Sequence, residues 1–288
     1  MATYARNPAY SDLTKDTIPP TNGPYPIAPI DFSDEFIDVM SYFNALLQKS
    51  ELSQRSLDIT SDVIRLNPAN YTAWHFRRRC LYHLGANLLE ELDHCRTFAR
   101  SNPKNYQIWY HRQALLDVIN SESDELDFVK TMLLLDSKNY HAWTFRQWIL
   151  TRFATSSLWI SELEYVSELI DDDVFNYSAW SHRRFVSDKL NISTQSEMIF
   201  TIDKIKISPT NESPWMYLRG LRTRSDFPSK IFDYIVAVAN DNRFAALVLA
   251  EHFELLNDRG SARYWFRKLS KIDSIRQDFW KREADLIE

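Results

Sequence analysis

A small group of side chains in this sequence has the chemistry of an anion-binding site. The group consists of Lys104, Lys138, His141, Tyr71, Tyr106 and Tyr140. Ammonium groups, an imidazole and phenols near the start of helices can all donate hydrogen bonds to phosphate oxygens. Because lysines on loops are also common for solubility alone, the group has functional weight only if the fold gathers it at one edge.

All six residues lie in or beside a recurring motif, Asn-Tyr-x-x-Trp-x-x-Arg. Regular copies begin at Asn70, Asn105, Asn139 and Asn176, and a degenerate copy begins at Asn211. The motif tryptophans are 35, 34, 37 and 35 residues apart. This period fits one helix–turn–helix unit. Residues that recur in every copy share a packing task, so function is expected where the copies differ.

The position directly after the tyrosine differs between the copies. It carries Thr72, Gln107, His141, Ser178 and Ser213. In a stack of hairpins, the loops that enter the second helix of each unit would lie along one edge. The sequence therefore predicts that Lys104, Gln107 and His141 lie close together on that edge, with the motif tyrosines beside them.

The recurring residues predict how the hairpins are built. Asn can accept hydrogen bonds from the exposed amides at a helix start. The indole is expected to fill the seam between hairpins, and the arginine to pair with carbonyls or a carboxylate of the next unit. In the first helix of one hairpin, Leu126, Val129, Leu133 and Leu134 are expected to share the buried face. The predicted fold is all-α, an α–α superhelix formed as a right-handed crescent of antiparallel helical hairpins, similar to a tetratricopeptide solenoid.

Composition supports this prediction and excludes several functions. The chain has four glycines in 288 residues, too few for a sheet with tight hairpins or for a phosphate-binding glycine loop. A net charge of −5 and a pI near 5.8 give no general attraction to nucleic acid or to an anionic membrane. No apolar segment approaches the ~20 residues of a membrane span, and no signal core precedes residue 30. The expected location is cytoplasmic.

The chain divides into an arm and a repeat domain. Six of eleven prolines lie in residues 1–30, which predicts an extended arm. The helical-repeat domain is expected from residue 31 to residue 288. Its repeats are placed near residues 55–84, 88–119, 124–152, 158–188 and 194–223, followed by degenerate helices over 229–286.

A search for a complete catalytic centre finds none. Neither a CxxC nor an HExxH spacing occurs, and Cys80 and Cys95 lie on apolar helical faces, where a buried structural thiol is expected. His111 and His182 each follow a motif tryptophan by two residues and are interpreted as packing or hydrogen-bonding groups. The chain is therefore not expected to bind a metal or to act as an enzyme by itself.

The repeats resemble those of protein prenyltransferase α subunits. The segments 103–109 (PKNYQIW) and 136–148 (DSKNYHAWTFRQW) are similar to the α subunit shared by farnesyltransferase and geranylgeranyltransferase type I. The resemblance extends from about Tyr10 to Trp280 and includes the segment NGPYP at residues 22–26.

This resemblance implies an obligate heterodimer with a β subunit that carries the catalytic zinc. The implied reaction transfers a farnesyl or geranylgeranyl group from its diphosphate to the cysteine of a C-terminal CaaX motif, in proteins such as small GTPases. Mg²⁺ would assist the farnesyl reaction. Neither nucleic acid nor membrane insertion is implied. The α chain would support the β subunit and contribute contacts to the leaving group and to the peptide.

The resemblance also implies roles for individual residues. Lys104, Tyr140 and His141 would contact the diphosphate, and Gln107 would bind the C-terminal carboxylate of the peptide. Tyr71 would flank the last peptide side chain, and Tyr106 would lie near the site. No direct contact is implied for Lys138.

Two alternatives remain open. One is a non-catalytic interaction scaffold of the tetratricopeptide type, which has nearly the same period but a different motif. The other is the α subunit of the Rab geranylgeranyltransferase, which generally carries additional domains. The sequence does not determine which β subunit is paired, and so does not select between the two lipids.

Overall fold

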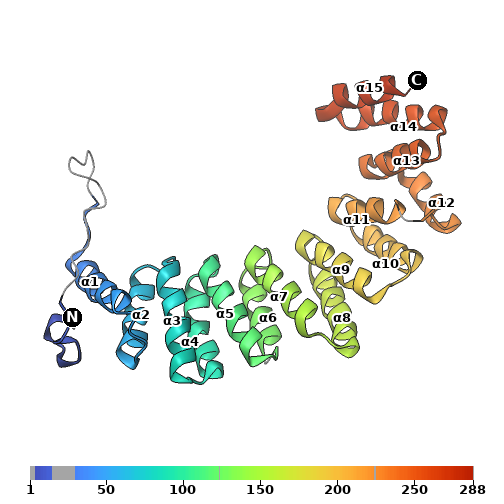
Figure 1. The fold of residues 1–288 in the computed structure, drawn as a ribbon. Helices are drawn as coiled ribbons and strands as arrows, with labels where there is room; N and C mark the ends of the chain where they lie inside the picture. The colour runs from blue at the N-terminus through green and yellow to red at the C-terminus, as the bar shows by residue number, and fades with distance from the viewer. Residues whose placement is uncertain (1–3, 15–29, 123, 224, 288) are drawn as a thin grey trace. The chain divides into compact units, whose positions relative to one another are not determined.

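The structure is a computed structural model that describes residues 4–14, 30–122, 124–223 and 225–287 (Figure 1). These residues form fifteen α-helices and three short 3₁₀ helices, and none of them is in a β-strand. The prediction of an all-α chain of helical hairpins is thus confirmed. None of the helices is long and apolar enough to cross a membrane. The chain forms two compact units, residues 1–153 and 154–288.

The first unit contains a leading helix and three hairpins. Its helices are α1 (Asp34–Gln48), α2 (Gln54–Leu66), α3 (Tyr71–Leu84), α4 (Leu88–Ser101), α5 (Tyr106–Ile119), α6 (Glu125–Leu135) and α7 (Tyr140–Phe153). The hairpins are α2–α3, α4–α5 and α6–α7, and the second helices α3, α5 and α7 pack on one another in sequence. Helix α1 begins at a capped end, because the Ser33 hydroxyl accepts the amide of Phe36 at 3.2 Å.

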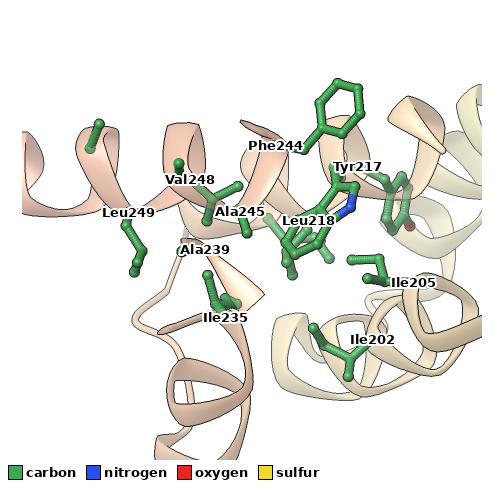
Figure 2. Packing of buried hydrophobic residues seen from close by; sticks show 14 of the residues in the cluster. Ile202, Ile205, Tyr217, Leu218, Ile235, Ala239, Phe244, Ala245, Val248 and Leu249 are labelled. Atoms are coloured by element: carbon green, nitrogen blue, oxygen red, sulfur yellow. The ribbon is translucent and has the colours of Figure 1, made fainter. Parts of the chain in front are cut away.

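The second unit continues the same construction. Its helices are α8 (Ser156–Asp172), α9 (Tyr177–Leu190), α10 (Thr194–Ile207), α11 (Glu212–Arg222), α12 (Ser229–Val238), α13 (Arg243–Leu255), α14 (Arg259–Ile272) and α15 (Gln277–Leu286). The second helices α9, α11 and α13 pack on one another, and α14 packs between α13 and α15. Its apolar core includes Ile202, Leu218, Ile235 and Leu249, contributed by four successive helices (Figure 2).

In the first four hairpins the second helix has a constant length and the first helix varies, whereas α11, the second helix of the fifth hairpin, has only 11 residues. The second helices α3, α5, α7 and α9 each have 14 residues. The first helices of the same hairpins, α2, α4, α6 and α8, have 13, 14, 11 and 17 residues. The loops that enter the second helices are 67–70, 102–105, 136–139 and 173–176, which are four residues each. The segment that carries the predicted site residues therefore has a constant length.

The motif asparagine and tryptophan together fix each of these loops. The Asn105 side chain accepts the amides of Gln107 and Ile108, as predicted for a helix cap. The Trp109 indole donates to the carbonyl of Pro103 at 2.9 Å, six residues earlier. The other motif tryptophans make the same contact with residues 68, 137, 174 and 209. The five indoles are only 0–7% exposed, so their predicted place in the seams is confirmed.

The same carbonyl also joins one repeat to the next. The Asn139 side-chain amide donates to the Pro103 carbonyl at 3.1 Å. Asn211 makes the equivalent bond to Val174, and Asn242 makes it to Pro209. Asn242 caps α13 without a following tryptophan, so this part of the repeat continues one unit beyond the motif.

The arginines of the four regular motif copies are buried, and they tie neighbouring helices together. Arg77 on α3 holds both oxygens of Glu91 on α4, at 2.6 and 2.7 Å, and donates to the Leu57 carbonyl of α2. Arg112 binds Glu125 and the Leu92 carbonyl in the same way, and Arg183 binds both oxygens of Glu197. These contacts confirm the predicted pairing of the arginine with the next unit.

Two of these glutamates have a further partner on the second helix of their own hairpin. His111 Nε2 lies 3.0 Å from Glu91 Oε1, and the Tyr217 hydroxyl donates to Glu197 at 2.6 Å. Burial lowers the pKa of His111 to about 4 despite the nearby carboxylate. Burial raises the pKa of Glu91, but hydrogen bonds from His111 and Arg77 outweigh it and hold that pKa at about 2. His182 likewise contacts Glu162, so both histidines are hydrogen-bonding groups, as predicted.

Several local predictions were wrong. Leu134 is 75% exposed, because the buried face of α6 runs through residues 125, 128, 129, 132 and 133 at helical spacing. Residues 4–14 of the arm are not extended: they form 3₁₀ helices at Tyr4–Arg6 and Pro8–Tyr10. Buried Tyr10 donates to the Arg55 carbonyl, and this contact holds the segment against α2. The remaining arm prediction, for residues 15–29, lies outside the described residues.

Acid pH should destabilise the chain through His111. Its pKa is about 4 in the folded chain and ~6.5 when exposed, so unfolding takes up a proton between these values. The free energy of unfolding should therefore fall by about 1–3 kcal/mol as the pH drops from about 6.5 to about 4. Urea titrations at several pH values measure this loss. The His111→Gln variant lacks the titrating imidazole but keeps a side chain that can hydrogen-bond to Glu91, so its free energy of unfolding should fall less over this pH range. An equal fall in His111→Gln and wild type would contradict the assignment to His111.

Candidate functional site

The predicted site residues lie at the starts of two helices that pack against each other. Lys104 is in the loop before α5, and Tyr106 and Gln107 are the first two residues of α5. Tyr140 and His141 are the first two residues of α7. The structure brings these two helix starts together, because Asn139 donates to the Pro103 carbonyl. The site is therefore an edge formed by two constant-length loops.

Lys104 is an exposed cation with one weak partner. Its side chain is 79% exposed, and its Nζ lies 3.9 Å from Asp136 Oδ2. The other carboxylate oxygen of Asp136 accepts the amide of Lys138, which shapes the loop before α7. Because exposed pairs of this kind contribute little energy, the ammonium group is free to exchange this partner for a ligand. Sequence reasoning missed Asp136, although it begins the segment 136–148 that carries the family resemblance.

Aromatic contacts set the position of His141. The rings of Tyr106 and His141 meet edge to face, with 4.2 Å between their centroids, and the Tyr140 ring is 5.7 Å from His141. Tyr106 and Tyr140 are about 70% exposed, so their phenols face solvent. Partial burial lowers the pKa of His141 below its ordinary value. At neutral pH this imidazole is a neutral hydrogen-bond donor.

The remaining predicted residues are less closely joined. Gln107 is half-buried, and its backbone amide is held by Asn105. Tyr71 begins α3, the helix that packs beside α5, and is 72% exposed. Its side chain meets no described residue through a ring contact or hydrogen bond. Lys138 is exposed, and its ammonium group has no partner among residues 4–14, 30–122, 124–223 and 225–287.

The chemistry of this edge comes from side chains and little from backbone amides. Asn139 already occupies the amides of His141 and Ala142, and Asn105 occupies those of Gln107 and Ile108. An anion here would therefore meet the Lys104 ammonium, the phenols and the imidazole. The positive ends of the α5 and α7 dipoles add attraction for negative charge.

One buried cluster has the composition of a metal site but not its chemistry. Ligand atoms of Glu91, Cys95 and His111 lie within 4.8 Å of one another. Arg77 already binds both oxygens of Glu91, and its positive charge opposes a cation at that carboxylate. Burial also raises the pKa of Cys95, which disfavours the thiolate that a metal requires. Cys80 and Cys95 are both buried free thiols, in agreement with the structural interpretation.

The repeats match a known family. The protein prenyltransferase alpha subunit repeat matches residues 53–84, 88–119, 122–153 and 159–190. The farnesyltransferase/geranylgeranyltransferase type-1 subunit alpha of Pisum sativum is 44% identical over 220 residues, which cover 74% of this chain and 65%, just under two thirds, of the pea protein. The subunit of that name in Dictyostelium discoideum is 39% identical over 231 residues, or 76% of this chain and 70% of its own length.

Two further similarities extend over nearly the whole chain. The subunit alpha of Schizosaccharomyces pombe is 36% identical over 272 residues, which cover 94% of this chain and 92% of that protein. A chain from the structure of Candida albicans protein geranylgeranyltransferase-I complexed with GGPP has a TM-score of 0.85 and 32% identity, and the match covers 97% of this chain and 98% of that chain. These repeats and full-length similarities establish that the chain belongs to the protein prenyltransferase alpha-subunit family.

Proposed function

We propose that this chain is the α subunit of a heterodimeric protein prenyltransferase, which transfers a farnesyl or geranylgeranyl group from its diphosphate to a CaaX cysteine. The observation that carries the proposal is the edge formed by α5 and α7, where Lys104, Tyr140 and His141 can approach one anion together. The relatives' names and the GGPP bound in the Candida enzyme agree with it.

In this proposal the α chain acts on the leaving group. As the bond between the isoprenoid C1 and the diphosphate breaks, negative charge grows on the diphosphate oxygens. The Lys104 ammonium would leave the weak contact with Asp136 and pair with that charge. Tyr140 and neutral His141 would donate hydrogen bonds to the same group. Contacts that strengthen as charge develops lower the barrier more than they tighten binding.

The rest of the chemistry belongs to the partner. The catalytic zinc, which in this proposal binds the substrate cysteine as a thiolate, is assigned to the β subunit, because the buried cluster in this chain does not suit a metal. Mg²⁺ in the farnesyl reaction is part of the same proposal. Gln107, Tyr71 and Tyr106 would form the α-chain side of the peptide site. Cytoplasmic location and small GTPases as substrates follow from the same assignment.

Coexpression with β subunits tests the proposal. The chain should co-purify as a one-to-one complex with a farnesyltransferase or type I geranylgeranyltransferase β subunit, and the complex should transfer lipid to a peptide that ends in CaaX. Assays with each diphosphate show which lipid is used. A chain that stays alone, or complexes without transferase activity, would favour the tetratricopeptide-type scaffold. Activity only toward Rab proteins would favour the Rab enzyme.

Replacing Lys104 should impair bond breaking selectively. Lys104→Ala should lower kcat by about tenfold or more, because the ammonium pairs with charge that appears in the transition state. Binding of the isoprenoid diphosphate, measured by fluorescence titration, should change little. Lys138→Ala is the matched control at the equivalent repeat position and should leave kcat unchanged. A loss of ground-state binding as large as the loss of kcat would refute this role.

Replacing Gln107 should affect the peptide instead. Gln107→Ala should raise KM for the CaaX peptide about tenfold, since a hydrogen bond to a charged carboxylate is lost. The value of kcat should change less. Ser178→Ala, at the same repeat position on α9, serves as the control. If KM for peptide were unchanged in Gln107→Ala, the carboxylate would have to bind elsewhere.

A further inference from the structure

The helix α3 exposes a face beyond the site residues. Tyr71, His75, Arg78 and Tyr82 follow one another at spacings of four, three and four, which places them on one side of the helix. Tyr71 and Tyr82 are 72% and 43% exposed. Arg78 is a cation and is partly buried.

The surroundings of Arg78 do not compensate its charge. Its Nη1 donates to His111 Nδ1 at 3.3 Å, and its guanidinium lies 5.0 Å from the centre of the Tyr110 ring. Arginine can only donate, so His111 Nδ1 accepts; neutral His111 then carries its proton on Nε2 and gives that hydrogen bond to Glu91. No carboxylate contacts Arg78 within the described chain. Burial lowers the pKa of Arg78; the neighbouring phenols of Tyr110 and Tyr82 oppose this shift only in part, and no carboxylate contributes to it.

The equivalent position in the other repeats serves as an internal comparison. It lies eight residues after the motif asparagine. The second and third repeats carry the neutral residues Gln113 and Gln147 there. Arg184 in the fourth repeat contacts Asp188 at 3.3 Å. Arg219 in the fifth repeat contacts Glu251 at 2.6 Å. Where this position is cationic elsewhere, the chain supplies an acid; at Arg78 it does not.

We propose that Arg78 is an anchor for a carboxylate of the β subunit, an Asp or Glu side chain that enters between Tyr82 and Tyr110 and pairs with the free edge of the guanidinium. The two tyrosines would shield this pair from water, which is the arrangement expected of an arginine that contributes strongly to an interface. The inference rests on the proposed function, because it takes the prenyltransferase β subunit as the occupant.

The position of Arg78 fits this occupant. It lies seven residues after Tyr71 on the same face of α3, about 10 Å along the helix. A β subunit that completes the peptide site beside Tyr71 would have to cover the first turn of α3. If the same interface extends about two turns further along α3, it also covers Arg78. The network behind it, through His111 to Glu91 and Arg77, holds the guanidinium in place before the partner arrives.

Subunit exchange tests the anchor in the intact heterodimer. Preformed complexes are mixed with an excess of tagged wild-type α chain, and the release of untagged α chain is followed. Arg78→Gln should accelerate release about 30-fold, because it leaves the partner carboxylate buried without its cation. The variant should fold, since glutamine occupies this position in two other repeats and can still donate to His111. Its melting temperature as free chain should match wild type.

Two further variants make the result decisive. Arg79→Gln removes the same charge from an exposed neighbour on α3, and it should leave the release rate within about twofold. Arg78→Lys keeps the charge and should release more slowly than Arg78→Gln. Wild-type release rates in Arg78→Gln, an equal acceleration in Arg79→Gln, or no advantage of Arg78→Lys over Arg78→Gln would each overturn the anchor.

A change confined to the KM for the peptide would assign Arg78 to substrate binding instead. Failure of the wild-type chain to pair with any β subunit would refute the proposed function itself.

Discussion

The stacking of this chain depends on burying one arginine in each of the four regular repeats. Arg77, Arg112 and Arg183 are at most 6% exposed, and an unpaired cation at such depth would be very costly. Each one needs the two oxygens of a glutamate on the following helix, and Arg77 and Arg112 also use a carbonyl of the preceding helix. Three helices must therefore meet at a fixed distance and rotation around every guanidinium. A buried pair of this kind specifies an arrangement more than it adds stability.

That arrangement determines where the site can form. With the second helices held in register, the loops before α5 and α7 lie side by side and are joined at the Pro103 carbonyl. The recurring tryptophan and arginine side chains are buried behind this edge. Gln107 and His141 differ from their counterparts in the other repeats, and Lys104 differs from all but Lys138, because these positions are not needed for packing. The scaffold thus leaves these positions available for chemistry.

Much of this could be predicted from the sequence, because the repeat shows each task several times. Recurrence separated Asn, Trp and Arg from the variable positions, and the variable positions led to Lys104 and His141. Contacts made only once could not be predicted in this way. Asp136 beside Lys104 and the docking of Tyr10 near Arg55 depend on tertiary distances that no periodicity records. The prediction for Leu134 was wrong because its apolar type suggested burial, although it lies about 100° around the helix from Leu133, the last residue of the buried face.

The constant four-residue loops determine how such a chain can change in length. An added or lost residue between the accepting carbonyl and the tryptophan six positions later would break the hydrogen bond from the indole and rotate the second helix. A residue added to the first helix, or to the turn between the two helices of a hairpin, changes neither contact. First helices of 11 to 17 residues show that this freedom has been used. In the first unit, insertions and deletions should therefore be tolerated in the first helices and in the turns within the hairpins, while the loops that form the α5–α7 edge keep one register.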